Sequence, residues 1–190
     1  MTQSKGDVRL GRFISLVLRH DPSAAGITLD GHGWAVVDDL ITGMNQHGRT
    51  IDEKTLRRIV AENNKTRYSF SDDGLRIRAN QGHSIDVDVE LVAADPPPVL
   101  YHGTALRFLD SIKASGISRQ QRQYVHLSPD LATAVQVGKR HGAPVVLRID
   151  SAAMVRDECT FFLSNNGVWL TESVPWRYVI GVEIPNKSTE

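Results

Sequence analysis

Apolar positions in the first ninety residues follow a helical period at first and a strand period later. From Leu10 to Leu18 they recur at the spacing of one helix face. Asp7 is a plausible N-cap for this helix, and Asp21-Pro22 should end it, because the residue before proline avoids helical torsions. Two more helices are expected, one from about Val37 through Met44 and one that opens with a capping box at Thr50–Glu53.

The period then changes to the alternation of a strand. Residues 67–70 and 75–79 alternate on either side of a polar turn at 71–74, which predicts a β-hairpin. Three helices followed by a hairpin are the order of a winged helix. That fold usually handles nucleic acid, although a fold alone does not establish a function.

A proline triplet marks the expected domain boundary. A short strand is predicted over Val87, Val89 and Leu91, and Asp95-Pro96-Pro97-Pro98 then stiffens the chain. We therefore divide the sequence into a first lobe at 1–93, a linker at 94–98 and a second lobe at 99–190.

The second lobe reads as many short strands mixed with helices, an α+β arrangement. Its first strand, Val99–Tyr101, is expected to end at His102-Gly103-Thr104. The further expected elements are a helix at 105–114, a strand at 125–127, a helix at 130–141, a strand at 145–149, a hairpin of 161–163 with 168–170, and a strand at 178–184.

Composition narrows the class of protein. The 190 residues carry 22 Lys and Arg against 22 Asp and Glu, so the strongly basic total of many nucleic-acid binders is absent, and an anion site requires local clustering. The single cysteine, Cys159, is expected to be a buried thiol and not a nucleophile. No apolar run approaches the length of a membrane span and no signal region opens the chain, so a cytoplasmic protein is expected.

The familiar catalytic strings are missing. The sequence has no Gly-rich phosphate loop of either common pattern, no HExxH and no paired CxxC, and its seven histidines lack metal-ligand spacing. No metal site is expected.

The informative feature is a series of short polar islands in apolar surroundings. Each island alone favours a structural interpretation: Arg19-His20 would be a charge pair at a helix end, residues 81–84 a turn, and His102 a hydrogen-bonded core histidine. The short sequences of interest are, in chain order, LRH at 18–20, KTRY at 65–68, IRANQGHS at 77–84, LYHGT at 100–104, RQYVHLS at 122–128, VGKRHG at 137–142 and NGVWLT at 166–171.

Together, and in this order, these pieces resemble the RNA 2′-phosphotransferase family, which uses NAD⁺ to finish tRNA splicing in fungi and also occurs in bacteria. The resemblance covers about Leu10 to Ile184. One departure is Tyr124, where the family usually has histidine; His126 is retained.

The resemblance implies a winged-helix-like lobe that binds RNA and an ADP-ribosyltransferase-like lobe that binds NAD, with the site expected in the cleft between them. The family's catalytic Arg-His-Arg-Arg set maps onto Arg19, His20, Arg67 and Arg122. Lys65 is expected to support the second step. The positions implied to contact NAD are Tyr101, His102, Gly103, Thr104, His126, Ser128, Arg140 and Val168.

The chemistry implied by the resemblance suits these residue types. A 2′-phosphate carries close to two negative charges, and arginine binds phosphate bidentately. The phosphate would attack the anomeric carbon of the nicotinamide ribose, and a ribose hydroxyl would then attack phosphorus. Related ADP-ribosyltransferases place a glutamate near the position of Val168, where this chain has no carboxylate. A phosphate nucleophile arrives already anionic, so it needs no general base, and a carboxylate would repel it.

Two other functions remain open at this stage. One is an ADP-ribosyltransferase that modifies a terminal phosphate of RNA or DNA and stops after the first step. The other is a non-enzymatic winged-helix binder, which would need a basic recognition helix; residues 52–63 instead mix both signs of charge. We expect a monomer, although no pattern in the sequence determines the oligomeric state.

Overall fold

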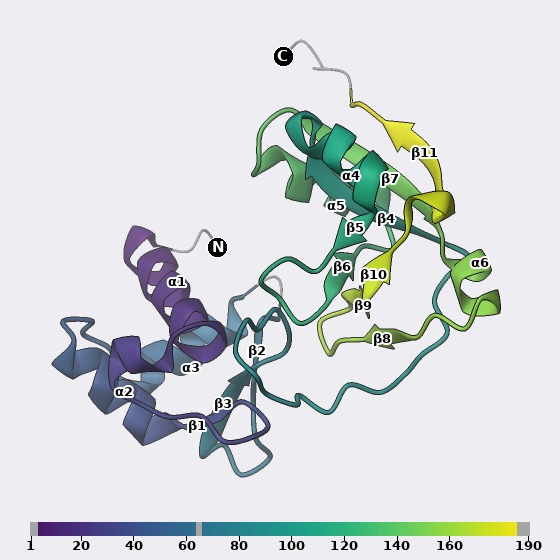
Figure 1. Ribbon diagram of the computed structural model, residues 1–190. Coiled ribbons are helices and arrows are strands. Elements are labelled where there is room, and N and C mark those ends of the chain that lie inside the picture. Colours follow the sequence, from purple (N-terminus) through teal and green to yellow (C-terminus); the bar gives the residue numbers. More distant parts are fainter. Residues whose placement is uncertain (1–3, 64–65, 186–190) are drawn as a thin grey trace. The chain divides into compact units, whose positions relative to one another are not determined.

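The computed structural model describes residues 4–63 and 66–185, and the chain divides into two compact units. Unit 1 spans Met1–Glu90 and unit 2 spans Leu91–Glu190 (Figure 1). Each unit has its own cluster of buried apolar side chains.

Unit 1 packs three helices against a small antiparallel sheet. Its elements are α1 (Lys5–Arg19), the 3-10 turn η1 (Pro22–Ala25), β1 (Trp34–Val36), α2 (Val37–Gln46), α3 (Glu53–Ala61), β2 (Tyr68–Phe70) and β3 (Arg76–Ala79). The strand order is β1-β3-β2, so the predicted hairpin of β2 and β3 is present and β1 adds to its other edge. Ile14, Leu18, Leu40, Leu56 and Ile77 are fully buried between these layers.

The helix starts differ from the sequence prediction. Asp7 is not the N-cap of α1: Ser4 accepts the backbone N–H of Asp7, and the Asp7 carboxylate lies in the first turn, buried against Arg58 at 2.7 and 2.9 Å. The Thr50–Glu53 capping box does not form either, because Asp52 caps α3 by accepting from Thr55 N at 2.8 Å. In each case a second residue able to cap lies two or three positions away, and at α1 the pairing with Arg58 engages the Asp7 carboxylate.

The strand predicted over residues 87–91 is also wrong. This stretch is irregular, and Glu90 adopts a φ of 58°, which interrupts an extended run. Only Val89 of the stretch is buried. The third strand of unit 1 is instead β1, a three-residue segment too short for alternation to reveal.

Unit 2 is built on two small sheets and several short helices. Its elements are β4 (Val99–Ala105), η2 (Leu106–Phe108), α4 (Leu109–Ser115), β5 (Ile117–Ser118), β6 (Val125–Leu127), α5 (Leu131–Lys139), β7 (Pro144–Asp150), α6 (Ser151–Arg156), β8 (Phe161–Leu163), β9 (Trp169–Thr171), β10 (Ser173–Val174), η3 (Trp176–Tyr178) and β11 (Val179–Glu183). The sheets run β11-β7-β4 and β6-β9-β8, and β10 pairs with β5.

The two larger sheets of unit 2 are joined at one point. Tyr101 of β4 and Ser128, just after β6, exchange both backbone hydrogen bonds, at 2.9 and 2.8 Å. The sequence prediction ended the first strand before His102, but β4 continues through Ala105. The HGT tripeptide therefore lies within a strand that pairs with β7 along its whole length.

The observed mixture of helices and small antiparallel sheets confirms the α+β class. The elements β5, β10 and α6 were not expected from the sequence. None of the helices within the described residues is long and apolar enough to cross a membrane.

Candidate functional site

Unit 1 gathers its candidate cations at the C-terminal end of α1. Arg19 is the last residue of the helix and His20 is its C-cap. The partly negative end of a helix favours cations. His20 Nδ1 lies 2.9 Å from Ser84 Oγ, and Ser84 N donates to Arg19 O at 3.0 Å, so residues distant in sequence are fixed together here.

Arg67 reaches the same region from the residue before β2. Its Nη1 donates to Asn63 Oδ1 at 3.1 Å, a neutral amide that leaves the arginine charge uncompensated. Burial raises the pKa of the neighbouring Tyr68, while the positive charges of Arg19 and Arg67 both act to lower it. Arg19, His20 and Arg67 thus lie in one region of unit 1, and their catalytic role stays a prediction; Lys65 lies outside the described residues.

His83 is part of this cluster, and sequence reasoning missed it as a site residue. It is 1% exposed, and burial, followed by the charges of Arg19, His20 and Arg78, lowers its pKa to about 4. Neither ring nitrogen has a hydrogen-bond partner among the described residues. His83 is therefore neutral near pH 7. Its place in the IRANQGHS string was the only signal that could have identified it.

Unit 2 gathers a second group where its two sheets join. His102 Nδ1 donates to His126 O at 3.1 Å, because a carbonyl oxygen can only accept. Nε2 of a neutral His102 is then an acceptor. Burial is the largest cause that lowers the pKa of His102, and the charges of Arg122 and His141 lower it further.

Arg122 completes this group. It hydrogen-bonds His126 Nδ1, and both burial and the charge of Arg140 lower its pKa. Two guanidinium groups therefore act on each other beside two histidines, and neither cause of the shift is a carboxylate. Such an arrangement favours an anion that compensates the charges. Like His83, His141 was not singled out from the sequence.

The remaining predicted positions of unit 2 have structural roles that can be stated. A side chain on Gly103 would overlap the carbonyl oxygen of Ala134 in α5, so this glycine permits close helix–strand packing. Thr104 is buried next to it in β4. Val168 lies in the turn between β8 and β9, where its carbonyl oxygen accepts from Ser164 N at 3.0 Å and its N–H donates to Ser164 Oγ at 3.1 Å. The glycine at 103 therefore has a packing role, and its predicted contact with NAD stays a prediction.

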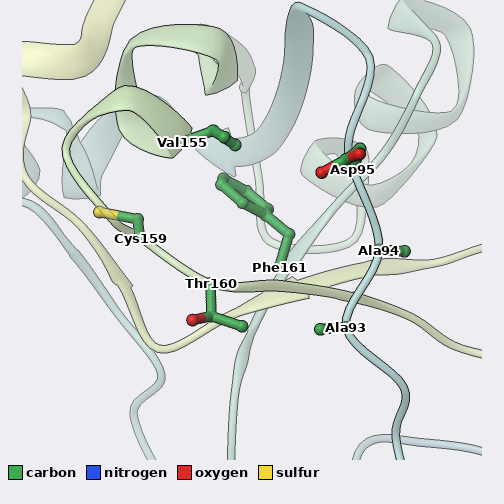
Figure 2. A pocket seen from close by; sticks show the side chains of 7 residues that line it. All are labelled: Ala93, Ala94, Asp95, Val155, Cys159, Thr160 and Phe161. Carbon is green, nitrogen blue, oxygen red and sulfur yellow. The ribbon is translucent and has the colours of Figure 1, made fainter.

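A pocket of about 350 Å³ lies elsewhere on unit 2 (Figure 2). Its lining includes Asp95, Val155, Cys159 and Phe161, and none of the predicted site residues. Cys159 is partly exposed, so the expectation of a buried thiol is wrong. Within the described ranges, no group of three or more His, Cys, Asp or Glu residues could hold a metal ion.

Fold and site together define a class: an α+β protein in which each unit clusters arginine and histidine side chains. The sequence profile of the RNA 2′-phosphotransferase, Tpt1 / KptA family matches residues 5–173. The chain belongs to this family.

Curated relatives agree with the profile. The chain is 52% identical to a probable RNA 2′-phosphotransferase of Fusobacterium nucleatum. The aligned stretch of 174 residues covers 91% of this chain and 97% of the relative. Probable RNA 2′-phosphotransferases of Agrobacterium fabrum and Pseudomonas aeruginosa are each 51% identical, over 88% of this chain and 90% and 93% of their own lengths.

Proposed function

We propose that this protein removes an internal 2′-phosphate from RNA by transferring it to NAD⁺, with release of nicotinamide and ADP-ribose 1″,2″-cyclic phosphate. The observation that carries the proposal is the family membership of the chain. The grouping of Arg19, His20 and Arg67 in unit 1, and of Arg122 and Arg140 in unit 2, supports it. RNA carrying a 2′-phosphate is the proposed substrate and NAD⁺ the co-substrate.

The RNA phosphate is assigned to Arg19, His20, Arg67 and Arg122. Arginine suits this task because its planar fork forms two hydrogen bonds to one phosphate. Arg67 and Arg122 are each hydrogen-bonded to a neutral group, Asn63 and His126, so their positive charge is retained for the substrate.

Unit 2 fits the nicotinamide riboside part of NAD⁺. His102 is held in one tautomer by His126 O and kept neutral by burial, so Nε2 can accept a ribose hydroxyl proton in a hydrogen bond. Arg140 is exposed, and its charge lowers the pKa of Arg122, so the two arginines lie near each other. We assign the pyrophosphate of NAD⁺ to Arg140. Tyr101 and Ser128, which join the sheets, are proposed to shape the same pocket.

The proposed reaction has two displacements. A 2′-phosphate oxygen first forms a bond to C1″ of the ribose while the C1″–N bond to nicotinamide breaks, through an oxocarbenium-like transition state. The ribose 2″-hydroxyl then loses its proton as its oxygen bonds to phosphorus, the bond from phosphorus to the RNA 2′-oxygen breaks, and the RNA 2′-oxygen gains a proton. The first step needs no general base, which suits a valine and not a carboxylate at position 168.

The test combines the protein, NAD⁺ and a short RNA with one internal 2′-phosphate, and resolves the products by mass. Cyclic phosphate and RNA with a free 2′-hydroxyl are the expected products. RNA or DNA that carries ADP-ribose on a terminal phosphate, with no cyclic phosphate, would instead support a terminal-phosphate ADP-ribosyltransferase. Failure to consume NAD⁺ with any phosphorylated nucleic acid would favour a non-enzymatic binder.

A further inference from the structure

The segment Ala79–Ser84 connects the two elements of unit 1 that carry candidate cations. It begins at the end of β3 and contacts both the start of β2, where Arg67 lies, and the end of α1, where Arg19 and His20 lie. The first contact is made by Asn80 and the second by Ser84.

Asn80 is a buried polar residue, 4% exposed, with its hydrogen-bonding groups used. Its backbone N–H donates to Arg67 O at 2.9 Å, and its side-chain Nδ2 donates to Thr66 O at 2.7 Å. Its Oδ1 accepts from Ser69 Oγ at 2.8 Å. Asn80 thus extends the β2–β3 pairing beyond the last strand pair, Tyr68 with Ala79, to the residues that present Arg67.

Thr66 shows why this position requires an anchor. Its φ is 41°, in the left-handed region that β-branched residues rarely adopt. Such a conformation persists only where the surrounding structure determines it. The amide of Asn80 holds the Thr66 carbonyl directly, so the unusual backbone that leads into Arg67 is fixed from the neighbouring strand.

Ser84 performs the corresponding task at the other end of the segment. Its N–H donates to Arg19 O at 3.0 Å, which ties the segment to the last helical residue. Its hydroxyl lies 2.9 Å from His20 Nδ1, which restricts rotation of the imidazole ring. Between these two anchors lies His83, buried and neutral, which adds no charge to the cluster.

We propose that Asn80 and Ser84 are positioning residues for the reaction, Asn80 acting through Arg67 and Ser84 acting through His20. The inference rests on the proposed function, because it assumes that Arg67 and His20 act on the RNA phosphate. The proposed role of each residue requires no contact of its own with the substrate.

The role of Ser84 is tested by Ser84→Ala and Ser84→Thr. Ser84→Ala should lower the turnover of 2′-phosphorylated RNA roughly three- to tenfold, the effect of one lost hydrogen bond, and shift the pH–rate profile and the His20 ¹⁵N NMR signals. Ser84→Thr keeps the hydroxyl and should restore all three. If Ser84→Ala leaves the His20 signals and the pH profile unchanged, the proposed role of Ser84 is wrong.

The role of Asn80 is tested by combining variants. Asn80→Ala alone should slow turnover, but Asn80→Ala added to Arg67→Ala should slow it no further, because the effect passes through Arg67. Ser71→Ala is the matched control, since it removes a hydroxyl that bonds Asp73 at 2.6 Å in the turn of the same hairpin, and it should leave turnover unchanged.

If Asn80→Ala does not fold, Ser69→Ala probes the same contact by removing the donor to Asn80 Oδ1, and should show the same dependence on Arg67. If Asn80→Ala or Ser69→Ala slowed turnover by the same factor in the wild type and in Arg67→Ala, the positioning role of Asn80 would be overturned. A wild-type protein that does not process the RNA would instead overturn the proposed function, so the two failures are distinguishable.

Discussion

At the scale of single residues, His83 and His102 are two histidines that burial keeps neutral beside arginines. The pKa of each is lowered chiefly by burial, and each lies close enough to an arginine, Arg19 or Arg122, for the positive charge to lower it further. A neutral imidazole can fill space or accept a hydrogen bond without adding to the repulsion among the cations. This arrangement keeps the arginines as the carriers of positive charge.

The buried His83 should make the stability of unit 1 depend on pH. Its pKa is about 4 in the folded protein and 6.5 in the unfolded chain, so the unfolded chain binds the proton first as the pH falls. The contribution of the neutral His83 to the free energy of unfolding is fully present above about pH 6.5, and it is lost as the pH falls from about 6.5 to 4. A difference of this size is worth on the order of 3 kcal/mol.

This loss can be measured by urea unfolding, followed through the NMR signals of unit 1 core residues between pH 7.5 and 4.5. His83→Leu removes the titrating ring and should flatten the dependence, even if it lowers stability at pH 7.5. An unchanged slope in His83→Leu would show that other groups cause it.

Arg67 and Arg122 should matter more for the second displacement than for the first. The first asks them to hold a nucleophile, whereas the second asks them to stabilise a crowded phosphorus centre whose charge is redistributing. Removing one charged donor costs on the order of 1.5–3 kcal/mol, or roughly ten- to a hundredfold in rate. We expect Arg67→Ala and Arg122→Ala to release nicotinamide and accumulate RNA that carries ADP-ribose on its 2′-phosphate, with Lys65→Ala showing a milder form.

A timed reaction with labelled RNA would reveal this species as a slower band that the wild type clears quickly. Proportional loss of nicotinamide release and RNA processing, with no such band at any time, would mean that the arginines serve binding or the first step.

His102→Ala should weaken NAD⁺ use while RNA binding stays nearly intact. The reason is its position within β4, where its Nδ1 is held by His126 O and its ring belongs to the group proposed for the nicotinamide ribose. KM for NAD⁺ and a direct RNA-binding titration give the two readouts. Equal losses in both would mean that His102 supports the fold.

At the scale of elements, sequence patterns predicted α1, α2, α3, the β2–β3 hairpin, the start of β4, α4, β6, α5, β7, the β8–β9 hairpin and β11. They did not predict α6 or the short strands β1, β5 and β10, none of which forms a hairpin with its neighbour in the chain. Pairing across the chain, not local period, creates such strands. Local sequence patterns also gave no reason to single out Ser84 and Asn80, because their hydrogen-bond partners are distant in the chain. Arg19 and Ser84, for example, are 65 positions apart.

The crossing of α5 over β4 depends on two glycines. A side chain on Gly103 would overlap Ala134 O, and one on Gly138 would lie 2.6 Å from Thr104 O. Gly103→Ala and Gly138→Ala should each destabilise unit 2 by about 1–3 kcal/mol through overpacking. The measurement is the urea midpoint of unit 2 signals.

Gly181→Ala is the control, because its added carbon would meet only the flexible side chain of Arg148, at 3.3 Å. Should Gly103→Ala prove as stable as Gly181→Ala yet fail to use NAD⁺, the role of this glycine would be contact with the co-substrate and not packing.

At the scale of the whole molecule, the formal net charge is zero, so an anion site depends on local clustering of cations. The proposed chemistry relies on arginines for charge stabilisation, so we expect activity to persist in EDTA without added metal. Loss of 2′-phosphate removal on chelation, with recovery only on addition of a divalent ion, would contradict a metal-free reaction.

The partly exposed Cys159 gives the molecule a property unrelated to catalysis. It is the single cysteine of the chain, and it lines a pocket that contains none of the proposed site residues (Figure 2). A maleimide dye would therefore label one defined point on unit 2 in the natural sequence. One introduced cysteine on the exposed surface of unit 1 would provide the second dye of an energy-transfer pair. Single-molecule recordings with this pair would test whether the distance between the two dyes changes during turnover.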